Sequence, residues 1–407
     1  MYWNSSKVIL WGCGHNAEDI YSWLNNEGIN DIIICAIGDN DVNKQGRSFH
    51  SIPILSLDEI KAIQYEADAV IVTITNCKSV YDQLVQMLEI PVFDNFWSFY
   101  NQRFSFDISG WCNAKCEFCS TGRKNREVVP SQNYMKADYF IKCYQHLRKI
   151  GLLHNLHEIM LYSWGEPFLN KDFLNILDYI ASQKQRFSLS TNASVVQLTN
   201  TPGAYESCST VIFSLSGMKQ ESYSRIHGFD IEKTQKNISM LIRNMREHGF
   251  SGEAILSFHV YKFNQEELSD ARQFSEDHEL IFKPINAYLA GWDLQDRFVN
   301  NRLNDVERKE IEDSLITTGI RELIKKRPNN YRCPLENIIS IDYQGKLELC
   351  CCSDADAKNF YWDNIDKIKS VSEWKQYRKV MLECDTCKEC RKSGVDYWIN
   401  NSEKICT

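Results

Sequence analysis

The sequence predicts an α/β protein in three parts: a parallel sheet covered by helices, a partial barrel of six strand–helix units, and a small cysteine-rich α+β extension. Three observations predict this fold class. Short β-branched runs alternate with helical patterns in residues 1–100, longer strand–helix units repeat in 101–300, and cysteines crowd the turn-rich end of 301–407. Because alternating strands and helices build parallel sheets with helices on their faces, we expect three domains with these bounds.

The N-terminal domain is predicted from three short apolar runs. KVILW (7–11), IIICA (32–36) and AVIVTI (69–74) have the β-branched composition of buried parallel strands. Helical patterns occupy 16–27, 57–63 and 78–88. The alternation of strand and helix indicates a βαβ arrangement, and hence a parallel sheet.

A glycine-rich turn follows the first of these strands. Gly12, Gly14 and Ala17 fit the spacing G-x-G-x-x-A, and Asp39 ends the second strand about twenty residues later. This segment resembles the Rossmann-like N-terminal domains attached to sugar-nucleotide and surface-polysaccharide enzymes. The resemblance implies either a nucleotide or nucleotide-sugar site at Gly12, Gly14 and Asp39, with phosphate at the helix N-terminus, or a degenerate docking module.

The central domain repeats the strand–helix theme with longer units. Six candidate strands lie at 104–108, 159–162, 187–190, 210–216, 253–259 and 280–285. Helical patterns fill the gaps at 134–150, 171–184, 232–248 and 265–278. Right-handed crossovers should curl these strands into a partial (β/α)6 barrel of the TIM type, whose active site lies at the C-terminal ends of the strands.

Three cysteines follow the first barrel strand in the run WCNAKCEFCSTG. Cys112, Cys116 and Cys119 form a tight loop of thiolates, which suits a soft metal or a cluster. A structural zinc site takes four ligands, and this loop has no fourth cysteine or histidine close by in the sequence. A 4Fe–4S cluster takes four thiolates, so three leave one iron open for chemistry. The rival interpretation is a structural metal loop.

The C-x3-C-x2-C spacing, with the aromatic Phe118 before the last cysteine, resembles the radical S-adenosylmethionine (radical SAM) superfamily. The resemblance implies that Cys112, Cys116 and Cys119 hold a 4Fe–4S cluster whose open iron binds the amino and carboxylate groups of SAM. One electron from the cluster, supplied by a donor such as flavodoxin or ferredoxin, then cleaves SAM to methionine and a 5′-deoxyadenosyl radical. That radical abstracts hydrogen from the substrate.

Gly165, Glu166 and Pro167 come directly after the second barrel strand. They are similar to the family's GGEP motif, with Trp164 in place of the first glycine. This similarity implies that Glu166 accepts a hydrogen bond from the methionine amino group of SAM, and that Gly165 allows close backbone approach. The tripeptide Gly-Glu-Pro taken alone is also typical of a turn. Its position one strand after the cysteine loop favours the cofactor role.

Polar residues end the next two strands, and an arginine follows on a helix. Ser190 and Asn192 are similar to the family's ribose-contacting segment, with an ordinary asparagine turn as the alternative. Ser216 stands where many relatives carry an aspartate in a Ser-x-Asp-Gly-like element. Arg225 either meets the carboxylate of the cofactor or is a solvated helix arginine.

Two histidines, His227 and His259, also lie in this half of the barrel sequence. Either one offers a polar group on the substrate side. Since a lone histidine is more often structural, we leave both out of the predicted catalytic set.

The last domain carries two groups of cysteines and no core-sized apolar pattern, so a metal is expected to stabilise it. Its Cys-x9–15-Gly-x4-Cys spacing, with Asn364–Ile365 and Glu373–Trp374 before the final cysteines, resembles the SPASM or shorter twitch extension of many radical SAM enzymes. Such extensions hold one or two auxiliary iron–sulfur clusters.

The resemblance implies one auxiliary 4Fe–4S cluster, with four predicted ligands: Cys333, Cys350, Cys387 and Cys390. Cys384 is an alternative to one of the last pair, and Cys351 or Cys352 competes with Cys350. A zinc knuckle is the rival interpretation. The auxiliary cluster either binds substrate or accepts an electron after hydrogen abstraction, and the sequence leaves this choice open.

Composition bounds the partners and the compartment. The chain of 407 residues has a net charge of −8, which gives no support for a nucleic-acid surface. The N-terminus shows no secretory signal, and no stretch of about 18 apolar residues predicts a membrane span. We therefore expect a cytoplasmic protein without nucleic-acid or membrane partners, whose 16 cysteines serve metal binding or catalysis more than disulfides.

The predicted function is hydrogen abstraction from a small molecule. The Rossmann-like domain favours a sugar or nucleotide-sugar derivative, with oxidation or epimerisation as the outcome. One alternative is a peptide-modifying maturase, because SPASM extensions are common there, although the glycine-rich turn argues against the winged-helix recognition domain of such enzymes. The other alternative is a non-catalytic iron–sulfur or zinc protein that binds a partner or senses redox state.

Overall fold

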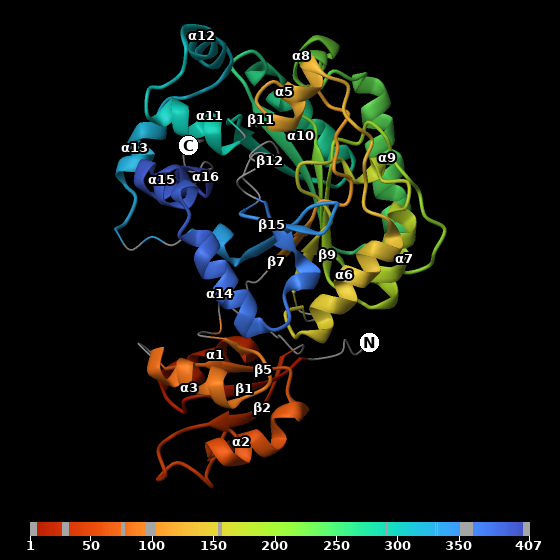
Figure 1. Cartoon of the computed structure of the whole chain (residues 1–407). Helices are drawn as coiled ribbons and strands as arrows, with labels where there is room; N and C mark the ends of the chain where they lie inside the picture. The colour runs from red at the N-terminus through yellow and green to blue at the C-terminus, as the bar shows by residue number, and fades with distance from the viewer. Residues whose placement is uncertain are drawn as a thin grey trace. The chain divides into compact units, whose positions relative to one another are not determined.

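The computed structural model describes residues 6–26, 32–74, 78–93, 96, 103–153, 157–289, 291–329, 331, 333–350 and 361–401. The chain divides into two compact units (Figure 1). The first comprises Met1–Arg103, Lys142–Glu158 and Asp366–Tyr377, and the second comprises Phe104–Ile141, Ile159–Ile365 and Arg378–Thr407. Cys351 and Cys352, proposed above as competing ligands, lie outside the described residues. The division into three domains at 1–100, 101–300 and 301–407 stays a prediction.

The first unit is built on a six-stranded sheet in the order β3-β4-β2-β1-β5-β6. Its strands are β1 (Ser6–Trp11), β2 (Ile32–Gly38), β3 (Ser48–Phe49), β4 (Ile52–Leu55), β5 (Ala69–Val72) and β6 (Val92–Phe93). All neighbouring pairs are parallel except β3 and β4, which form an antiparallel pair. The predicted parallel sheet is therefore confirmed, and the sequence missed only the short strands β3, β4 and β6.

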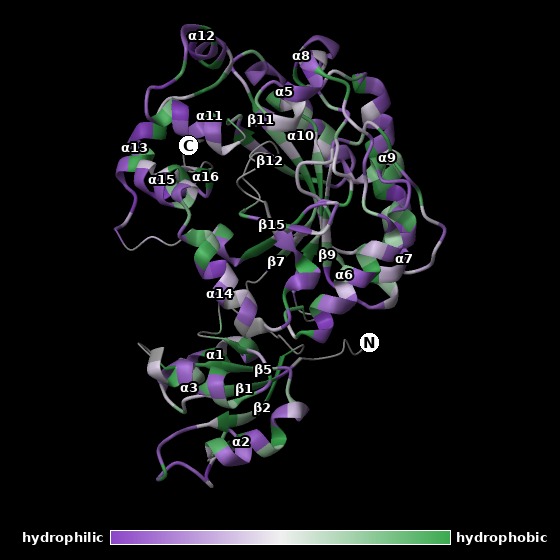
Figure 2. Cartoon of the chain, in the orientation of Figure 1, coloured by the Kyte–Doolittle hydropathy of each residue, from purple (hydrophilic) through white to green (hydrophobic). Residues whose placement is uncertain are grey.

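Both faces of this sheet are buried by helices. The helices are α1 (His15–Asn26), α2 (Leu57–Ile63) and α3 (Lys78–Met87), followed by the short 3-10 helix η1 (Gln64–Glu66) after α2. Val8 and Leu10 of β1 pack in one cluster with α1, while Ile9 and Trp11 pack in a second cluster with α2 and α3. Successive side chains of a strand point to opposite faces, so a continuous apolar run serves both cores. Figure 2 shows these strands as hydrophobic segments.

The second unit contains a nine-stranded sheet in the order β12-β11-β10-β9-β8-β7-β13-β14-β15. Its first six strands follow the chain: β7 (Arg103–Phe106), β8 (Glu158–Met160), β9 (Phe187–Thr191), β10 (Cys208–Ser214), β11 (Glu253–Val260) and β12 (Ile281–Asn286). The pairs from β8 to β12 are parallel. All six predicted barrel strands are present within a few residues of their predicted bounds.

Helices connect these strands and lie outside them in Figure 1. They are α5 (Ser120–Glu127), α6 (Ala137–Lys149), α7 (Phe173–Ser182), α8 (Gln220–Ile226), α9 (Ile231–Glu247) and α10 (Leu268–Asp277), with 3-10 helices η2 (Pro167–Leu169) and η3 (Gln265–Glu267). Helix α9 illustrates why they form. Asp230 caps it by accepting from the Lys233 N–H, and Ile238, Leu241 and Ile242 recur on its buried face.

The C-terminal part continues the barrel sheet instead of forming a sheet of its own. Strands β13 (Ile338–Ile341), β14 (Lys346–Glu348) and β15 (Tyr361–Asn364) extend the sheet beyond β7, and β14 is antiparallel to both of its neighbours. The Asp107 N–H donates to the Ile341 carbonyl at 2.9 Å. Gly345 turns the β13–β14 hairpin with φ 80°, and a Cβ there would lie 2.3 Å from the Tyr139 hydroxyl.

The remaining helices are α11 (Trp292–Val299), α12 (Asp305–Ser314), α13 (Ile320–Lys325), η4 (Pro334–Asn337), η5 (Ile365–Lys367), α14 (Val371–Leu382), α15 (Asp385–Ser393) and α16 (Val395–Ile399). An apolar cluster joins α11, α12 and α13 to Trp398 of α16 and to Phe118 of the cysteine loop. The segment between β12 and η4 therefore shares an apolar core with the cysteine loop and with α16. Among the described helices, none has the length and apolar character that a membrane crossing requires.

Candidate functional site

The three-cysteine loop, residues 112–119, lies between β7 and α5 and is fastened to that helix. Cys119 occupies the position just before α5. Asn125, on α5, donates through Nδ2 to the carbonyls of Cys112 and Ala114, both at 2.7 Å. One side chain therefore fixes the backbone of the first half of the loop against the helix that the second half begins.

A glycine allows this close packing. A Cβ at Gly122 of α5 would lie 2.4 Å from the Cys116 carbonyl oxygen, closer than side chains tolerate. On the other side of the loop, the Lys115 N–H donates to the His227 carbonyl at 3.1 Å, and Arg126 Nε donates to the Lys115 carbonyl at 2.8 Å. The loop is therefore held between α5 and the end of α8.

The three cysteines of this loop are half-buried, and the thiols of Cys112 and Cys116 have polar neighbours. Cys112 Sγ accepts from the Ala114 N–H at 3.4 Å and from Asn192 Nδ2 at 3.6 Å. Cys116 Sγ lies 3.4 Å from Nδ1 of His227. Burial raises the pKa of Cys116 to about 12, and it also raises the pKa of Cys112 well above its usual value. Since a bound metal deprotonates its thiols, this donor set fits a cationic iron–sulfur core.

Glu166 lies at the end of β8 and is 3% exposed. Its Oε1 accepts from the Thr191 hydroxyl at 2.7 Å, and its Oε2 accepts from the Asn192 N–H at 2.7 Å. Burial raises the pKa of Glu166 to about 7, although these hydrogen bonds oppose the shift. The structure thus brings Glu166, Asn192 and Cys112 into one hydrogen-bonded group.

The neighbours of Glu166 hold its turn. A Cβ on Gly165 would lie 2.5 Å from Asp107 Oδ1, so the turn after β8 can approach the end of β7 only with glycine. Pro167 is buried and begins η2. The Glu166 N–H donates to the Trp111 carbonyl at 2.8 Å, which ties this turn to the cysteine loop.

Two predicted serines have different surroundings. Ser190 lies in β9, half-buried, beside Thr191. Ser216 is fully buried just beyond β10, where its N–H donates to Nε2 of His227 at 3.3 Å and its hydroxyl accepts from the His259 N–H at 3.1 Å. Burial lowers the pKa of His227 to about 3 and that of His259 to about 4.

Sequence reasoning left both histidines out of the site. His227 caps the C-terminus of α8, and its ring approaches a cysteine that is 111 residues away in the sequence. Neither position belongs to a motif. His227 follows β10, as do the predicted Ser216 and Arg225, and this shared position was its available signal. His259, in contrast, lies within β11, which carries no predicted site residue.

Arg225 and Phe118 face the α11–α13 segment. Arg225 donates to the Ser314 hydroxyl at 2.9 Å and its guanidinium lies 3.9 Å from the centre of the Phe263 ring. Phe118 is 2% exposed, with its ring 6.1 Å from that of Tyr261. A contact of either side chain with the cofactor stays a prediction.

A cavity of about 550 Å³ lies beside the cysteine loop. Trp111 and Trp164 line it together with acidic residues and lysines. The acids are Asp107, Asp342 and Glu348, and the lysines are Lys124 and Lys346. Cavities of this size and mixed lining are typical of small-molecule sites. Trp164, which replaces a glycine of the family motif, therefore forms part of the wall.

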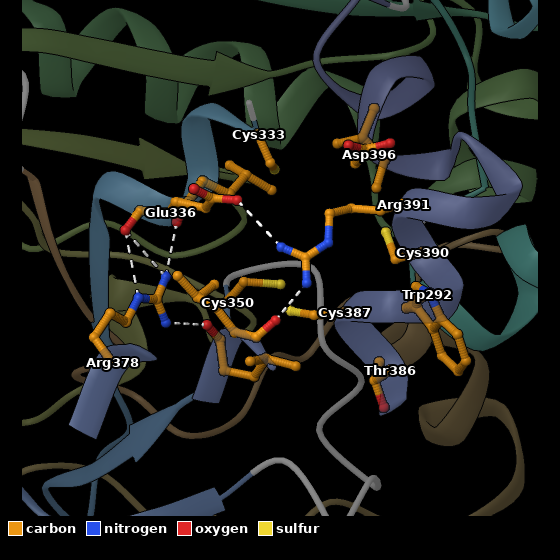
Figure 3. Close-up of a pocket in the computed structure, with 14 residues that line it drawn as sticks. Trp292, Cys333, Glu336, Cys350, Arg378, Thr386, Cys387, Cys390, Arg391 and Asp396 are labelled. Atoms are coloured by element: carbon orange, nitrogen blue, oxygen red, sulfur yellow. Dashed lines mark hydrogen bonds and ion pairs between the residues drawn. The ribbon is translucent and has the colours of Figure 1, made fainter. Parts of the chain in front are cut away.

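A second cysteine site lies in the C-terminal part (Figure 3). All four predicted auxiliary ligands, Cys333, Cys350, Cys387 and Cys390, line one pocket. The first two flank the β13–β14 hairpin, and the others lie one turn apart on α15. Cys384, the alternative ligand, is the residue just before α15 and does not line this pocket.

The chemistry of this pocket suits a cluster with several irons. Burial raises the pKa of Cys333 and of Cys387 to about 12, and neighbouring thiols raise both further. Figure 3 shows the sulfurs of Cys350 and Cys387 pointing toward each other. Among the described residues, no group of three or more His, Cys, Asp or Glu side chains is placed to hold a single metal ion.

Arg378 of α14 forms one wall of this four-cysteine pocket. Its guanidinium is buried and donates to the carbonyls of Leu349 at 2.6 Å and Leu335 at 3.1 Å. Arg391 of α15 also lines the pocket and lies 3.6 Å from the Glu336 carboxylate. Thiolates and a cluster would carry negative charge here, and these two cations would offset it.

In the first unit the predicted glycine turn and acid come together. Gly12 has φ 110°, and a Cβ there would lie 2.5 Å from Ile74, whereas a Cβ on Gly14 would meet nothing within 4 Å. Asp39 accepts from the Cys13 N–H at 2.8 Å and from Lys44 Nζ at 3.0 Å. Burial alone would raise the pKa of Asp39, but these bonds and one from the Asp41 N–H lower it overall.

Comparisons with known proteins identify two families in the chain. Residues 106–274 match the radical SAM superfamily, and residues 4–91 match the family described as C2185-like, N-terminal. No curated protein matches the sequence.

Several solved structures are similar in fold. One is Streptococcus suis SuiB bound to S-adenosylmethionine, at 16% identity over 72% of this chain and 74% of that chain, with a TM-score of 0.44. SuiB bound to the precursor peptide SuiA is 14% identical over 76% and 78%, with a TM-score of 0.45. Native anSMEcpe with bound AdoMet is 14% identical over 70% and 82%, with a TM-score of 0.44. Likeness at this level identifies no substrate.

Proposed function

Starting from the radical SAM domain of residues 106–274, we propose that this chain is an enzyme that cleaves SAM reductively and abstracts hydrogen from a small-molecule substrate. Cys112, Cys116 and Cys119 would hold the 4Fe–4S cluster. When bound, cluster and SAM together supply the radical chemistry, while the protein orients the reactants and excludes water.

The observation that carries this proposal is the link between the three-cysteine loop and the turn after β8. Asn192 bonds Cys112 through its side chain and Glu166 through its backbone N–H, at 3.6 and 2.7 Å. Residues from the ends of β7, β8 and β9 therefore meet at one place. This is the end of a barrel at which active sites form.

Glu166 is suited to the ammonium group of SAM. Its carboxylate is buried and has a pKa near 7, so a cation beside it would lower that pKa and hold the acid in its charged form. Oε1 accepts from both the Thr191 hydroxyl and the Phe168 N–H, whereas Oε2 accepts only from the Asn192 N–H among the described residues, so a lone pair remains on Oε2 for a ligand.

The cavity beside the cysteine loop supports a small, polar substrate such as a sugar derivative. Its volume of about 550 Å³ suits one small molecule. Trp111 and Trp164 offer aromatic faces for the apolar side of a sugar ring, and Asp107 and Asp342 offer acceptors for hydroxyl groups. Oxidation of an alcohol or epimerisation would follow hydrogen abstraction from such a substrate.

A peptide substrate is the second candidate, and one observation favours it. Val128 and Val129, on the rim of the same cavity, are 64% and 93% exposed. Exposed apolar residues beside a cavity offer a surface for a longer ligand. Replacing Trp164 with alanine would weaken turnover of a sugar that stacks on the ring, whereas changing Val128 and Val129 to serine would weaken turnover of a peptide.

We further propose that the four-cysteine pocket holds an auxiliary cluster and that residues 301–407 form a SPASM or twitch-like extension. The support is that four cysteines from three separate segments line one buried space. The cluster would either bind substrate or take up an electron after hydrogen abstraction.

For the first unit we propose a Rossmann-like fold, supported by the parallel order β4-β2-β1-β5-β6. The Asp39 carboxylate forms an ion pair with Lys44 Nζ, so a ribose hydroxyl would have to compete with this ammonium group for the carboxylate. A thermal-shift screen of nucleotides and nucleotide-sugars separates the two roles. Stabilisation that Asp39→Asn abolishes indicates a nucleotide site, and no stabilisation indicates a docking module.

The test of the enzyme proposal is oxygen-free reconstitution followed by reduction with SAM. The wild type should hold about eight irons in two clusters and release 5′-deoxyadenosine. Changing Cys112, Cys116 and Cys119 to alanine should leave about four irons and abolish the release. Zinc in the loop, or a release that survives the triple substitution, would overturn the proposal.

A further inference from the structure

In the buried His227, the fold determines which ring nitrogen carries the hydrogen. The Ser216 backbone N–H donates to Nε2 of His227 at 3.3 Å. A backbone N–H cannot accept a proton, so Nε2 must present its lone pair and carry no hydrogen. The ring is therefore the neutral tautomer whose hydrogen is on Nδ1.

That hydrogen points toward a cysteine of the three-cysteine loop. Nδ1 lies 3.4 Å from Cys116 Sγ, within the range of an N–H···S hydrogen bond. The His227 carbonyl accepts from the N–H of Lys115, the residue before Cys116, so the histidine and the loop are fastened together. His227 is 4% exposed, which keeps water from taking the place of either partner.

The residue that sets the tautomer is itself held. The Ser216 carbonyl accepts from Asn264 Nδ2 at 3.0 Å, and the Ser216 hydroxyl accepts from the His259 N–H at 3.1 Å. These bonds hold the side chain of Ser216 and the peptide that follows it, and so fasten the residue whose N–H meets His227. Ser216, predicted to contact the cofactor, acts in this structure as the support of a histidine.

We propose that His227 is a positioning residue that donates its Nδ1–H to the Cys116 sulfur and thereby raises the reduction potential of the cluster in the three-cysteine loop. This rests on the proposed function, because it requires a cluster there. Hydrogen bonds to ligand sulfurs draw off negative charge, and the reduced cluster carries more of it than the oxidised one. The bond therefore favours the reduced state that cleaves SAM.

The decisive comparison is between His227→Asn and His227→Leu. The side-chain nitrogen of asparagine stands where Nδ1 stands in histidine, so His227→Asn keeps a donor, while leucine fills similar space without one. His278→Asn is the matched control, since His278 bonds Ser239 at 2.7 Å and lies on α10's end, away from the loop.

The readout is an EPR-monitored redox titration of the reconstituted protein with a chemical reductant. We expect a lower midpoint potential for His227→Leu, and values close to wild type for His227→Asn and His278→Asn. An unchanged potential in His227→Leu would overturn the proposal. So would a shift in His227→Asn as large as that in His227→Leu, because a merely space-filling histidine would produce it.

A second measurement needs no cluster. ¹⁵N NMR of the metal-free chain, labelled at its 9 histidines, reports the tautomer of each ring, and His227→Asn identifies the resonances of this one. We expect the Nδ1–H form, and the Nε2–H form would overturn the proposal even if the leucine variant fails to load iron. If the wild type binds zinc, the proposed function fails while the tautomer result still stands.

Discussion

The two cysteine sites of the second unit differ in what surrounds their thiols. The three-cysteine loop is bordered by Asn192, His227 and Glu166, all supplied by the ends of barrel strands or by the helix after one. The four-cysteine pocket is bordered by the guanidiniums of Arg378 and Arg391. Neutral donors and an acid border the loop, whereas two cations and the acids Glu336 and Asp396 line the pocket.

This difference teaches how each site balances charge. In the pocket, Arg391 pairs with Glu336 and Asp396 pairs with Arg327, so acids and cations compensate one another within the protein. The loop instead lies beside the buried acid Glu166, whose pKa is raised to about 7 by burial. Binding of a charged ligand at the loop and of a cluster in the pocket stays a proposal.

The largest expected effect is a loss of substrate turnover without a loss of SAM cleavage when the four-cysteine pocket is disrupted. Replacing Cys387 and Cys390 with alanine should lower substrate turnover at least about 100-fold and leave SAM cleavage unchanged, because only the pocket loses its ligands. Release of 5′-deoxyadenosine and product formation are measured side by side. Cys384→Ala is the control and should change neither. Continued turnover in the double variant would show that the pocket plays no part in the reaction.

The next effect concerns the cation of the pocket. Arg378→Met should destabilise the chain by about 2–3 kcal/mol, since it leaves the carbonyl of the buried Leu349 without its donor and removes the bond to the Leu335 carbonyl. Arg391→Met should cost about 1 kcal/mol or less, because the Arg391 side chain is 36% exposed. Urea unfolding of the metal-free proteins measures both. Equal losses would contradict the distinction between a buried and a half-exposed cation.

The acid of the loop site predicts a pH dependence. The folded-state pKa of Glu166 is raised by burial to about 7, from the 4.5 that is ordinary for a glutamate. A raised pKa gives stability that is fully present below the unfolded-state value and is lost as pH rises through the folded-state value. The free energy of unfolding should therefore fall by about 3 kcal/mol between pH values of about 4.5 and 8 from this group.

Glu166→Gln should remove that part of the slope, because glutamine does not titrate. Urea unfolding of the metal-free chain at several pH values compares the two proteins. A variant that keeps the full wild-type slope would contradict the assignment, whatever its stability at any one pH.

The sequence predicted the cysteines of both sites, Glu166 and Asn192, but it did not predict the other side chains that pack against the thiols. Cys112, Glu166 and Asn192 were found because each follows a barrel strand, and parallel strands end at one edge. The four cysteines that line the pocket were also predicted to lie together, and their role as ligands stays a prediction. His227 was not, because its role depends on a tautomer set by Ser216, which no pattern encodes. Arg378 was not, because an arginine on a helix normally indicates a solvated face.

The extension of the barrel sheet by β13, β14 and β15 was also unexpected. These strands have three or four residues each, too few for a periodic pattern, and β13 joins β7 across more than two hundred residues of sequence. Such pairing follows from tertiary packing and not from local preference.

The smallest expected effect tests the packing of the loop through two glycines. Gly122→Ala should destabilise the chain by about 1–3 kcal/mol, because its Cβ would lie 2.4 Å from the Cys116 carbonyl and would push α5 from the loop. Gly14→Ala should change stability by less than about 1 kcal/mol, since a Cβ there meets nothing within 4 Å. Iron loading of the loop should fall only in the first variant. Equal loading in both would mean that α5 does not shape the cysteine site, and that the loop depends on Asn192 and His227 alone.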